Sequence, residues 1–144
     1  ESKYQTISII DIRIDDKLFN IPTSYYTIID SGTTISYFPN ELHNKIMDEF
    51  KVFCSKSNKC MGEPYQSEFG RCFKVNQNIN FNQFAESMPI LTFDFGNNIS
   101  FEWNPHNYLV NVTNVYDSTL NLCTGFLGWG YFILIKLFRN IIGK

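Results

Sequence analysis

The residues with the clearest potential for chemistry form one short segment, in which an aspartate is followed by small hydroxyl residues around a glycine: Asp30-Ser31-Gly32-Thr33-Thr34. The apolar run before it, residues 25–29, predicts a β-strand that ends at Asp30. Gly32 allows the backbone to approach a carboxylate closely, and the hydroxyls of Ser31 and Thr33 can orient it by hydrogen bonds. The segment therefore predicts a positioned carboxylate at a strand-to-turn junction. A plain Asp-Ser-Gly turn without chemistry is the alternative.

The elements that would position this carboxylate are predicted to be mostly strands. In residues 4–14, Ile10, Ile12 and Ile14 alternate with charged residues, which is typical of a half-buried strand. Residues 18–21 are expected to return as its hairpin partner. Further strands are predicted over residues 35–38, 88–95, 99–103, 108–110 and 120–126, with a hairpin turn at Gly96-Asn97-Asn98.

One helix is predicted over residues 40–50, directly after Pro39. Asn40 is expected to cap its N-terminus. Its apolar residues share one face at helical spacing: Leu42, Ile46, Met47 and Phe50. The segment that follows, residues 51–82, is polar and contains three cysteines, so we expect an irregular excursion held by disulfides.

Four cysteines, Cys54, Cys60, Cys72 and Cys123, form no CxxC pair and no zinc pattern. Two disulfides in an oxidising compartment are the simplest interpretation, and four buried thiols are the alternative. Of the three possible pairings, one joins Cys54 to Cys60 around a short loop and Cys72 to Cys123 across distant segments.

Two sequons, Asn98-Ile99-Ser100 and Asn111-Val112-Thr113, indicate a glycoprotein of the secretory pathway. The first four residues lack the apolar region of a signal peptide, so we expect a targeting sequence upstream of this chain.

Charge and length limit the functions that the chain can have. The 144 residues carry 12 Lys and Arg against 14 Asp and Glu, and the net charge of −2 argues against a nucleic-acid partner. The chain is long enough for one domain or one lobe of a larger one.

Its final segment, residues 127–144, is apolar and then basic. The uncharged part is shorter than the roughly 20 residues of a spanning helix, so a membrane anchor is the weaker alternative.

Taken together, the motifs resemble those of the C-terminal lobe of a pepsin-like aspartic protease, of the plant or plasmepsin V-like type. The aspartate segment, followed by residues 35–39 and a helix, is similar to the second catalytic motif of that family. Residues 88–95 resemble its P-x-[IL]-x-F strand, and residues 103–109 resemble the P-x-x-Y-[LI] turn that follows. The placement of Cys72 and Cys123 is similar to the lobe disulfide.

The resemblance implies a mostly β lobe built on a closed or bent, barrel-like sheet with one or two short helices. It extends over residues 1–126, and residues 127–144 depart from the family pattern as an atypical terminus. Leu127-Gly128-Trp129 follows the last cysteine almost directly, and the family's V-F-D strand ending is absent from the sequence.

The resemblance also implies aspartic-type endopeptidase activity without cofactor or metal ion. Asp30 would be one of two catalytic aspartates, and the other would come from an N-terminal lobe that this chain does not contain. Ser31 would brace the two loops, Gly32 would present its N–H to the carboxylates, and Thr33 would bind Asp30. Thr34 and Tyr37 would lie nearby. We therefore expect a peptide substrate, a chain that is inactive alone, and an extracellular, vacuolar, lysosomal or endoplasmic-reticulum location.

Two alternatives remain open at this stage. The chain can be a pepsin-like binding or inhibitor module without activity, or an unrelated β-rich domain that binds glycans or proteins. The second requires the aromatic side chains of Phe93, Phe95, Phe101 and Trp103 to be exposed, whereas we expect them to pack in the core. His43 and His106 have no evident metal partner in the sequence, and surface or capping roles are expected for both.

Overall fold

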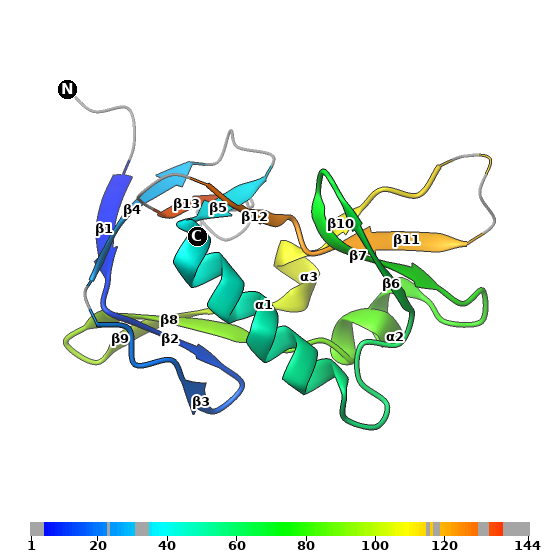
Figure 1. The fold of residues 1–144 in the computed structure, drawn as a ribbon, viewed down its shortest axis with the longest axis horizontal. Helices are drawn as coiled ribbons and strands as arrows, with labels where there is room; N and C mark the ends of the chain where they lie inside the picture. Colours follow the sequence, from blue (N-terminus) through cyan, green and yellow to red (C-terminus); the bar gives the residue numbers. More distant parts are fainter. Residues whose placement is uncertain are drawn as a thin grey trace.

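The computed structural model describes residues 5–22, 24–30, 35–114, 116, 119–129 and 133–136. Three open sheets and three helices make up this part of the chain (Figure 1). The predicted mostly-β fold is confirmed. The sheets have free edges, however, and do not close into a barrel.

A five-stranded sheet contains the strand that ends at Asp30. In spatial order its strands are β1 (Gln5–Ile9), β4 (Tyr25–Asp30), β13 (Ile133–Lys136), β5 (Ser36–Phe38) and β12 (Phe126–Gly128). The second sheet consists of β3 (Lys17–Leu18), β2 (Asp11–Ile14), β8 (Leu91–Gly96) and β9 (Ile99–Trp103). The third consists of β10 (Val110–Asn111), β11 (Leu120–Cys123), β7 (Gly70–Val75) and β6 (Glu63–Ser67).

The first predicted strand is bent into two, β1 and β2, which belong to different sheets. At the bend, the N–H of Ile10 donates to the carbonyl of Asp94 at 2.8 Å. The hairpin partner β3 is shorter than the predicted residues 18–21. The turn between β8 and β9 is confirmed, because Asn97 and Asn98 both have positive φ, at 56° and 61°, as a type I′ turn requires.

The predicted helix is confirmed as α1 (Asn40–Cys54), with one correction at its start and one at its end. The cap position is Pro39, and α1 has no side-chain cap hydrogen bond, so Asn40 is the first helical residue and not the cap. The helix continues past Phe50 because Phe53 extends the buried face that Leu42, Ile46 and Phe50 begin.

The prediction of an irregular segment over residues 51–82 is wrong. It contains the end of α1, the β6–β7 hairpin and the start of α2 (Phe81–Glu86). The sequence does not indicate strand β6, because its side chains are almost all exposed and show no alternation. Helix α2 begins with a capping box between Asn80 and Gln83.

Tyr108 also lies in a helix and not in the strand expected over residues 108–110. Asn104 accepts a hydrogen bond from the N–H of His106, and Pro105 occupies the first turn of α3 (Pro105–Tyr108). Proline is favoured at that position because its fixed φ suits a helix start.

The core is dominated by aromatic rings around Phe126. Its ring centroid lies 5.7 Å from those of Phe38, Phe50 and Trp103, and 5.8 Å from that of Tyr108. Phe126 is fully buried. This cluster joins β5, α1 and β9 to the start of β12.

The predicted packing of aromatic side chains is confirmed in the second sheet. Phe93 and Trp103 are buried, and Phe95 and Phe101 are partly buried against the same core. These four rings therefore do not form an exposed platform for glycans.

Two disulfides hold the part of the chain beyond α1. Cys54 is joined to Cys60 at the end of α1. Cys72 of β7 is joined to Cys123 of β11, and the two residues are direct partners in the antiparallel register. No helix within the described residues is long and apolar enough to cross a membrane.

Candidate active site

Asp30 is the last residue of β4, as the sequence predicts. For Asp30 the structure describes the backbone. The next four residues of the predicted site, Ser31, Gly32, Thr33 and Thr34, lie outside the described residues, and their roles stay predictions.

The sheet topology determines how far apart the two strands on either side of the aspartate segment lie. Strands β4 and β5, on either side of the segment, are not direct neighbours, because β13 lies between them. Strand β13 runs parallel to β4, with Lys136 opposite Asp30, and antiparallel to β5, with Leu134 opposite Tyr37. The end of β4 and the start of β5 therefore lie about two strand spacings apart, or roughly 10 Å.

The strands on both sides of the aspartate segment are attached to buried structure. On the β4 side, Thr27 is fully buried and its hydroxyl donates to the carbonyl of Tyr25. On the β5 side, Ile35 and Ser36 are buried, and the N–H of Ser36 donates to the carbonyl of Gly125 at 2.9 Å. The backbone at each end of the segment is thus fixed by packing.

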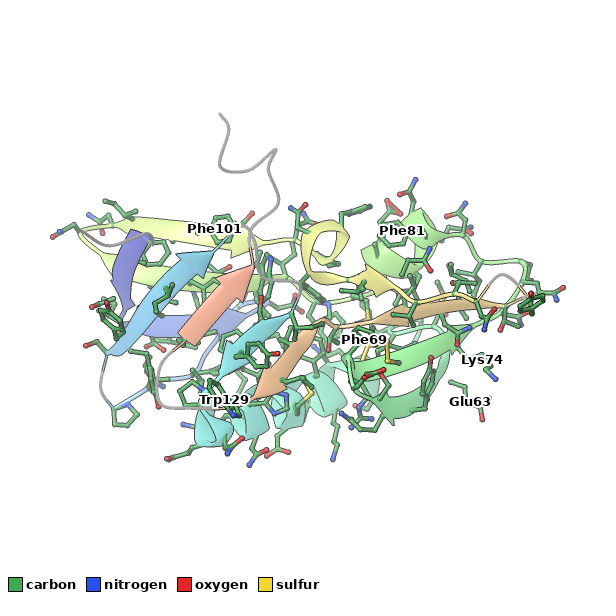
Figure 2. All side chains as sticks on the ribbon, turned by 90° about the horizontal axis from the view of Figure 1, so that it is seen from above. Glu63, Phe69, Lys74, Phe81, Phe101 and Trp129 are labelled. Atoms are coloured by element: carbon green, nitrogen blue, oxygen red, sulfur yellow. A yellow bond between two sulfur atoms is a disulfide. The ribbon has the colours of Figure 1, made fainter. Side chains whose placement is uncertain are left out.

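Tyr37, the predicted neighbour of the site, lies half-buried in β5. Its ring meets that of Trp129 edge to face, with centroids 5.9 Å apart. Trp129 is 63% exposed and projects beside β12 (Figure 2), and its backbone N–H donates to the carbonyl of Phe38 at 2.7 Å. Trp129 was not among the predicted site residues. The signal that the sequence offers for Trp129 is its position directly after Leu127-Gly128, in the terminus that departs from the family pattern.

The terminal segment contributes to the sheet that contains Asp30. Strand β12 begins at Phe126 and continues past the predicted lobe boundary to Gly128, and it pairs in parallel with β5. Gly128 allows β12 to approach α1, because a Cβ atom there would lie 2.6 Å from Oδ1 of Asn40 and 3.2 Å from Cβ of His43.

The two histidines lie in different surroundings. His43 is half-buried in α1 beside Phe126, and this burial lowers its pKa from the usual value, although hydrogen bonds with the backbone of Phe126 and the side chain of Asn44 act in the opposite direction. His106 is exposed and contacts Asn104 through its ring nitrogen Nδ1. Among the described residues, no three His, Cys, Asp or Glu side chains form a group that could hold a metal ion.

The two predicted glycosylation sites are exposed. Asn98 lies in the β8–β9 turn, and Asn111 lies on β10, where its Oδ1 accepts hydrogen bonds from the N–H and the hydroxyl of Thr113. Exposure is a requirement for modification, and the modification itself stays a prediction.

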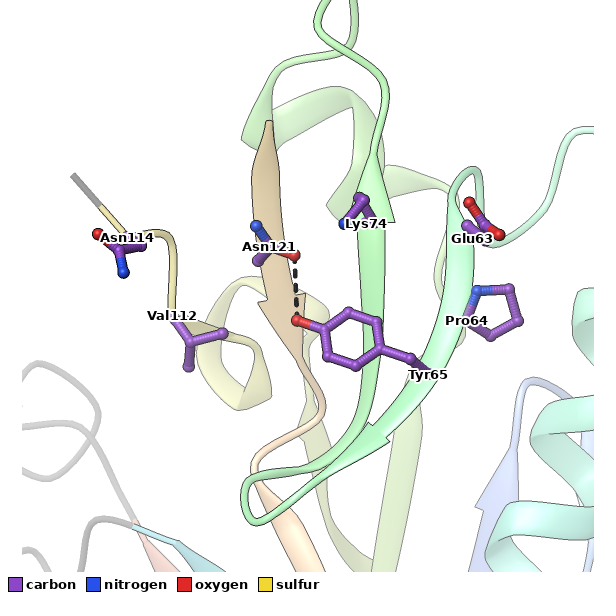
Figure 3. A pocket seen from close by; sticks show the side chains of 7 residues that line it. All are labelled: Glu63, Pro64, Tyr65, Lys74, Val112, Asn114 and Asn121. Atoms are coloured by element: carbon purple, nitrogen blue, oxygen red, sulfur yellow. Dashed lines mark hydrogen bonds between the residues drawn. The ribbon is translucent and has the colours of Figure 1, made fainter. Parts of the chain in front are cut away.

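A hollow of about 430 Å³ lies on the third sheet, at the opposite end of the molecule from β4 (Figures 1 and 3). Lys74 and Glu63 face it from paired positions of β7 and β6. Tyr65 is oriented there by a 3.0 Å hydrogen bond from its hydroxyl to Oδ1 of Asn121. This hollow is separate from the candidate active site, because none of its lining residues belongs to the five-stranded sheet.

The fold is that of the C-terminal lobe of the plant pepsin-like aspartic proteinases. A family model described as "Xylanase inhibitor C-terminal" matches residues 5–131. The chain belongs to this family.

Its curated relatives include two proteins of Arabidopsis thaliana. Aspartic proteinase 39 is 24% identical over 110 residues, which are 74% of this chain and 21% of the relative. Aspartic proteinase 36 is 29% identical over 86 residues, which are 60% of this chain and 16% of the relative. The chain therefore spans about a fifth of these proteins.

Solved structures share the fold at low identity. The protein titled edgp has a TM-score of 0.68 at 17% identity, and basic 7S globulin from soybean has a TM-score of 0.63 at 15% identity. Conglutin gamma from lupine seeds has a TM-score of 0.64 at 13% identity. Each match covers 90 or 91% of this chain and about a third of the other chain, from 31 to 33%.

Proposed function

We propose that this chain is the C-terminal lobe of an aspartic endopeptidase and that Asp30 provides one of its two catalytic carboxylates. The observation that carries the proposal is the position of Asp30 as the last residue of β4, directly before the Ser-Gly-Thr-Thr sequence. The two relatives named as aspartic proteinases support it.

The chemistry follows from placing two carboxyl groups beside one water molecule. Like charges about 3 Å apart cannot both ionise, so the pair shares a proton. The ionised carboxylate accepts a proton from the water as it attacks the peptide carbonyl, and the protonated partner donates to the carbonyl oxygen. Asp30 is one member of this pair. Gly32 presents its N–H to the carboxylates, Thr33 binds Asp30, and Ser31 braces the opposing loop.

The second aspartate comes from a lobe outside this chain. The proposal assigns residues 1–126 to the C-terminal lobe and treats residues 127–144 as its atypical terminus, which completes the five-stranded sheet with the rest of β12 and with β13. Disulfides and plant aspartic proteinase relatives support a secreted, vacuolar or other endomembrane protein, with Asn98 and Asn111 as glycan acceptors. A peptide or protein is the substrate.

The experiment that tests this proposal compares Asp30→Asn with Asp48→Asn in the full-length protein. Asp48 is exposed on α1, outside the candidate site. We expect Asp30→Asn to abolish peptide cleavage at acid pH and Asp48→Asn to leave it unchanged. Cleavage that survives in Asp30→Asn would remove this carboxylate from the mechanism.

A second function, a pepsin-like binding or inhibitor module without catalysis, is favoured by the family description and by the relatives that are named as globulins. It predicts that the wild-type full-length protein cleaves no peptide between pH 3 and 7. Cleavage by the wild type that Asp30→Asn abolishes would exclude it.

A further inference from the structure

A second hollow, of about 270 Å³, lies between the C-terminal half of α1 and the β6–β7 hairpin. Its walls are mainly apolar. Met47 and Phe50 line it from α1, and Phe73 lines it from β7. The Cys54–Cys60 disulfide lies at the same end of α1 and contributes both of its residues to the lining.

The charged residues that line this hollow, which we call the α1–β7 pocket, are Lys51 and Arg71, and both are cationic. Arg71 is half-buried. Within the described part of the chain, neither side chain lies within 4.0 Å of a carboxylate, since the ion pairs there are Arg13–Asp94 and Lys17–Glu49. A guanidinium that is partly removed from water without an anionic partner is favourably placed to bind an anion.

The loop that follows α1 carries two further cationic side chains. The amino groups of Lys56 and Lys59 lie over the ring of Phe53, at 5.3 and 5.4 Å from its centroid. Glu49, on the same helix, is already paired with Lys17 at 2.8 Å. The end of α1 and the loop after it therefore carry three cationic side chains, and Arg71 lines the pocket from β7.

We infer that the α1–β7 pocket binds a small anion with a one-ring apolar body, such as an aromatic carboxylate. A cavity of about 150 Å³ holds benzene, so 270 Å³ accommodates a ring with a short carboxylate-bearing chain. The ring contacts Phe50, Phe73 and Met47, and the carboxylate accepts charge-assisted hydrogen bonds from Arg71 and Lys51. This site is independent of Asp30 and of the proposed catalysis.

The test measures binding of cinnamate by calorimetry to the full-length protein, with the uncharged cinnamamide as its matched partner. We expect cinnamamide to bind at least tenfold more weakly than cinnamate. Arg71→Gln is expected to lower the affinity for cinnamate about tenfold, and Lys51→Gln is expected to lower it less. Lys56→Gln serves as the control, because Lys56 shares the positive loop but does not line the pocket.

A second variant, Met47→Trp, tests the volume of the pocket separately from its charge. It fills the apolar part, so we expect it to remove binding of both compounds while the circular dichroism spectrum of the protein is retained. Equal affinities for cinnamate and cinnamamide would overturn the inference. So would cinnamate binding that neither Arg71→Gln nor Met47→Trp changes, or the absence of binding to the wild type.

Discussion

The two ends of this lobe are stabilised by different means. At the end that contains β4 and Asp30, α1 lies beside the five-stranded sheet (Figure 1), and rings from β5 and α1 pack against Phe126 of β12. At the other end, the sheet of β10, β11, β7 and β6 has an almost wholly exposed edge strand and is crossed by the Cys72–Cys123 disulfide.

The aromatic end provides a rigid framework, and the disulfide end provides exposed surface. The aromatic end supplies the buried backbone on either side of the Asp30 segment, which a positioned carboxylate requires. The disulfide end has fewer large buried side chains and carries the two hollows described above, lined by residues such as Tyr65 and Arg71. A covalent link allows a sheet to expose much of its surface and still fold, because it restricts the unfolded chain.

The largest expected effect is at the aromatic end. Phe126→Ala removes a fully buried ring with five aromatic neighbours and should lower the free energy of unfolding by about 5 kcal/mol. Chemical denaturation measures this value. Phe101→Ala is the control, because Phe101 is only partly buried. If both variants lost equal stability, Phe126 would not be the centre of the core.

The disulfides are expected to follow in order of the loop that each closes. Cys72 and Cys123 are 51 residues apart, and Cys54 and Cys60 are 6 apart. Loop-closure entropy predicts a loss of about 4 kcal/mol for the first pair and about 2 kcal/mol for the second, when each pair is replaced by alanine. Denaturation of the two double variants checks this order. A larger loss for the short loop would show that entropy does not govern this end.

The smallest effect concerns pH at the aromatic end. Because burial lowers the pKa of His43 below its value in the unfolded chain, the unfolded state binds the proton more readily. The stability from the neutral ring is complete above about pH 6.5 and is lost as the pH falls through the folded pKa.

We therefore expect His43→Gln to lose less stability than the wild type between pH 7.5 and pH 5. His106→Gln is the control, because His106 is exposed. Denaturation midpoints at the two pH values provide the measurement. An equal loss in wild type and His43→Gln would contradict the burial of a neutral ring at this position.

How much the sequence predicted differs between the two ends. Strands that are short runs of β-branched and aromatic residues, such as β4, or that flank a tight turn, such as β8 and β9, are predicted correctly, because these signals are local. Helix α1 was found for the same reason. Its cap was predicted wrongly because Asn40 is a favourable capping residue, whereas the chain places Pro39 there.

The disulfide end was largely missed. Strand β6 has no buried face of its own, and β7 is a short strand that pairs both with β6 and with β11, the latter across 51 residues. Such tertiary pairing overrides local propensity. The return of the terminal segment as β13 between β4 and β5 was also beyond local pattern, because it depends on a long-range register. For the candidate site, sequence indicated Asp30 through its motif, while Trp129 became evident only from its contact with Tyr37.

The central claim is that the carboxyl group of Asp30 works with a second aspartate from another lobe. A crystal structure of the full-length protein tests it most directly, by measuring the distance between the two carboxyl groups. The account predicts that their nearest oxygens lie about 3 Å apart at the floor of a cleft between the lobes. An Asp30 carboxyl group on an outer face, with no second carboxyl group within reach of a shared water, would contradict it.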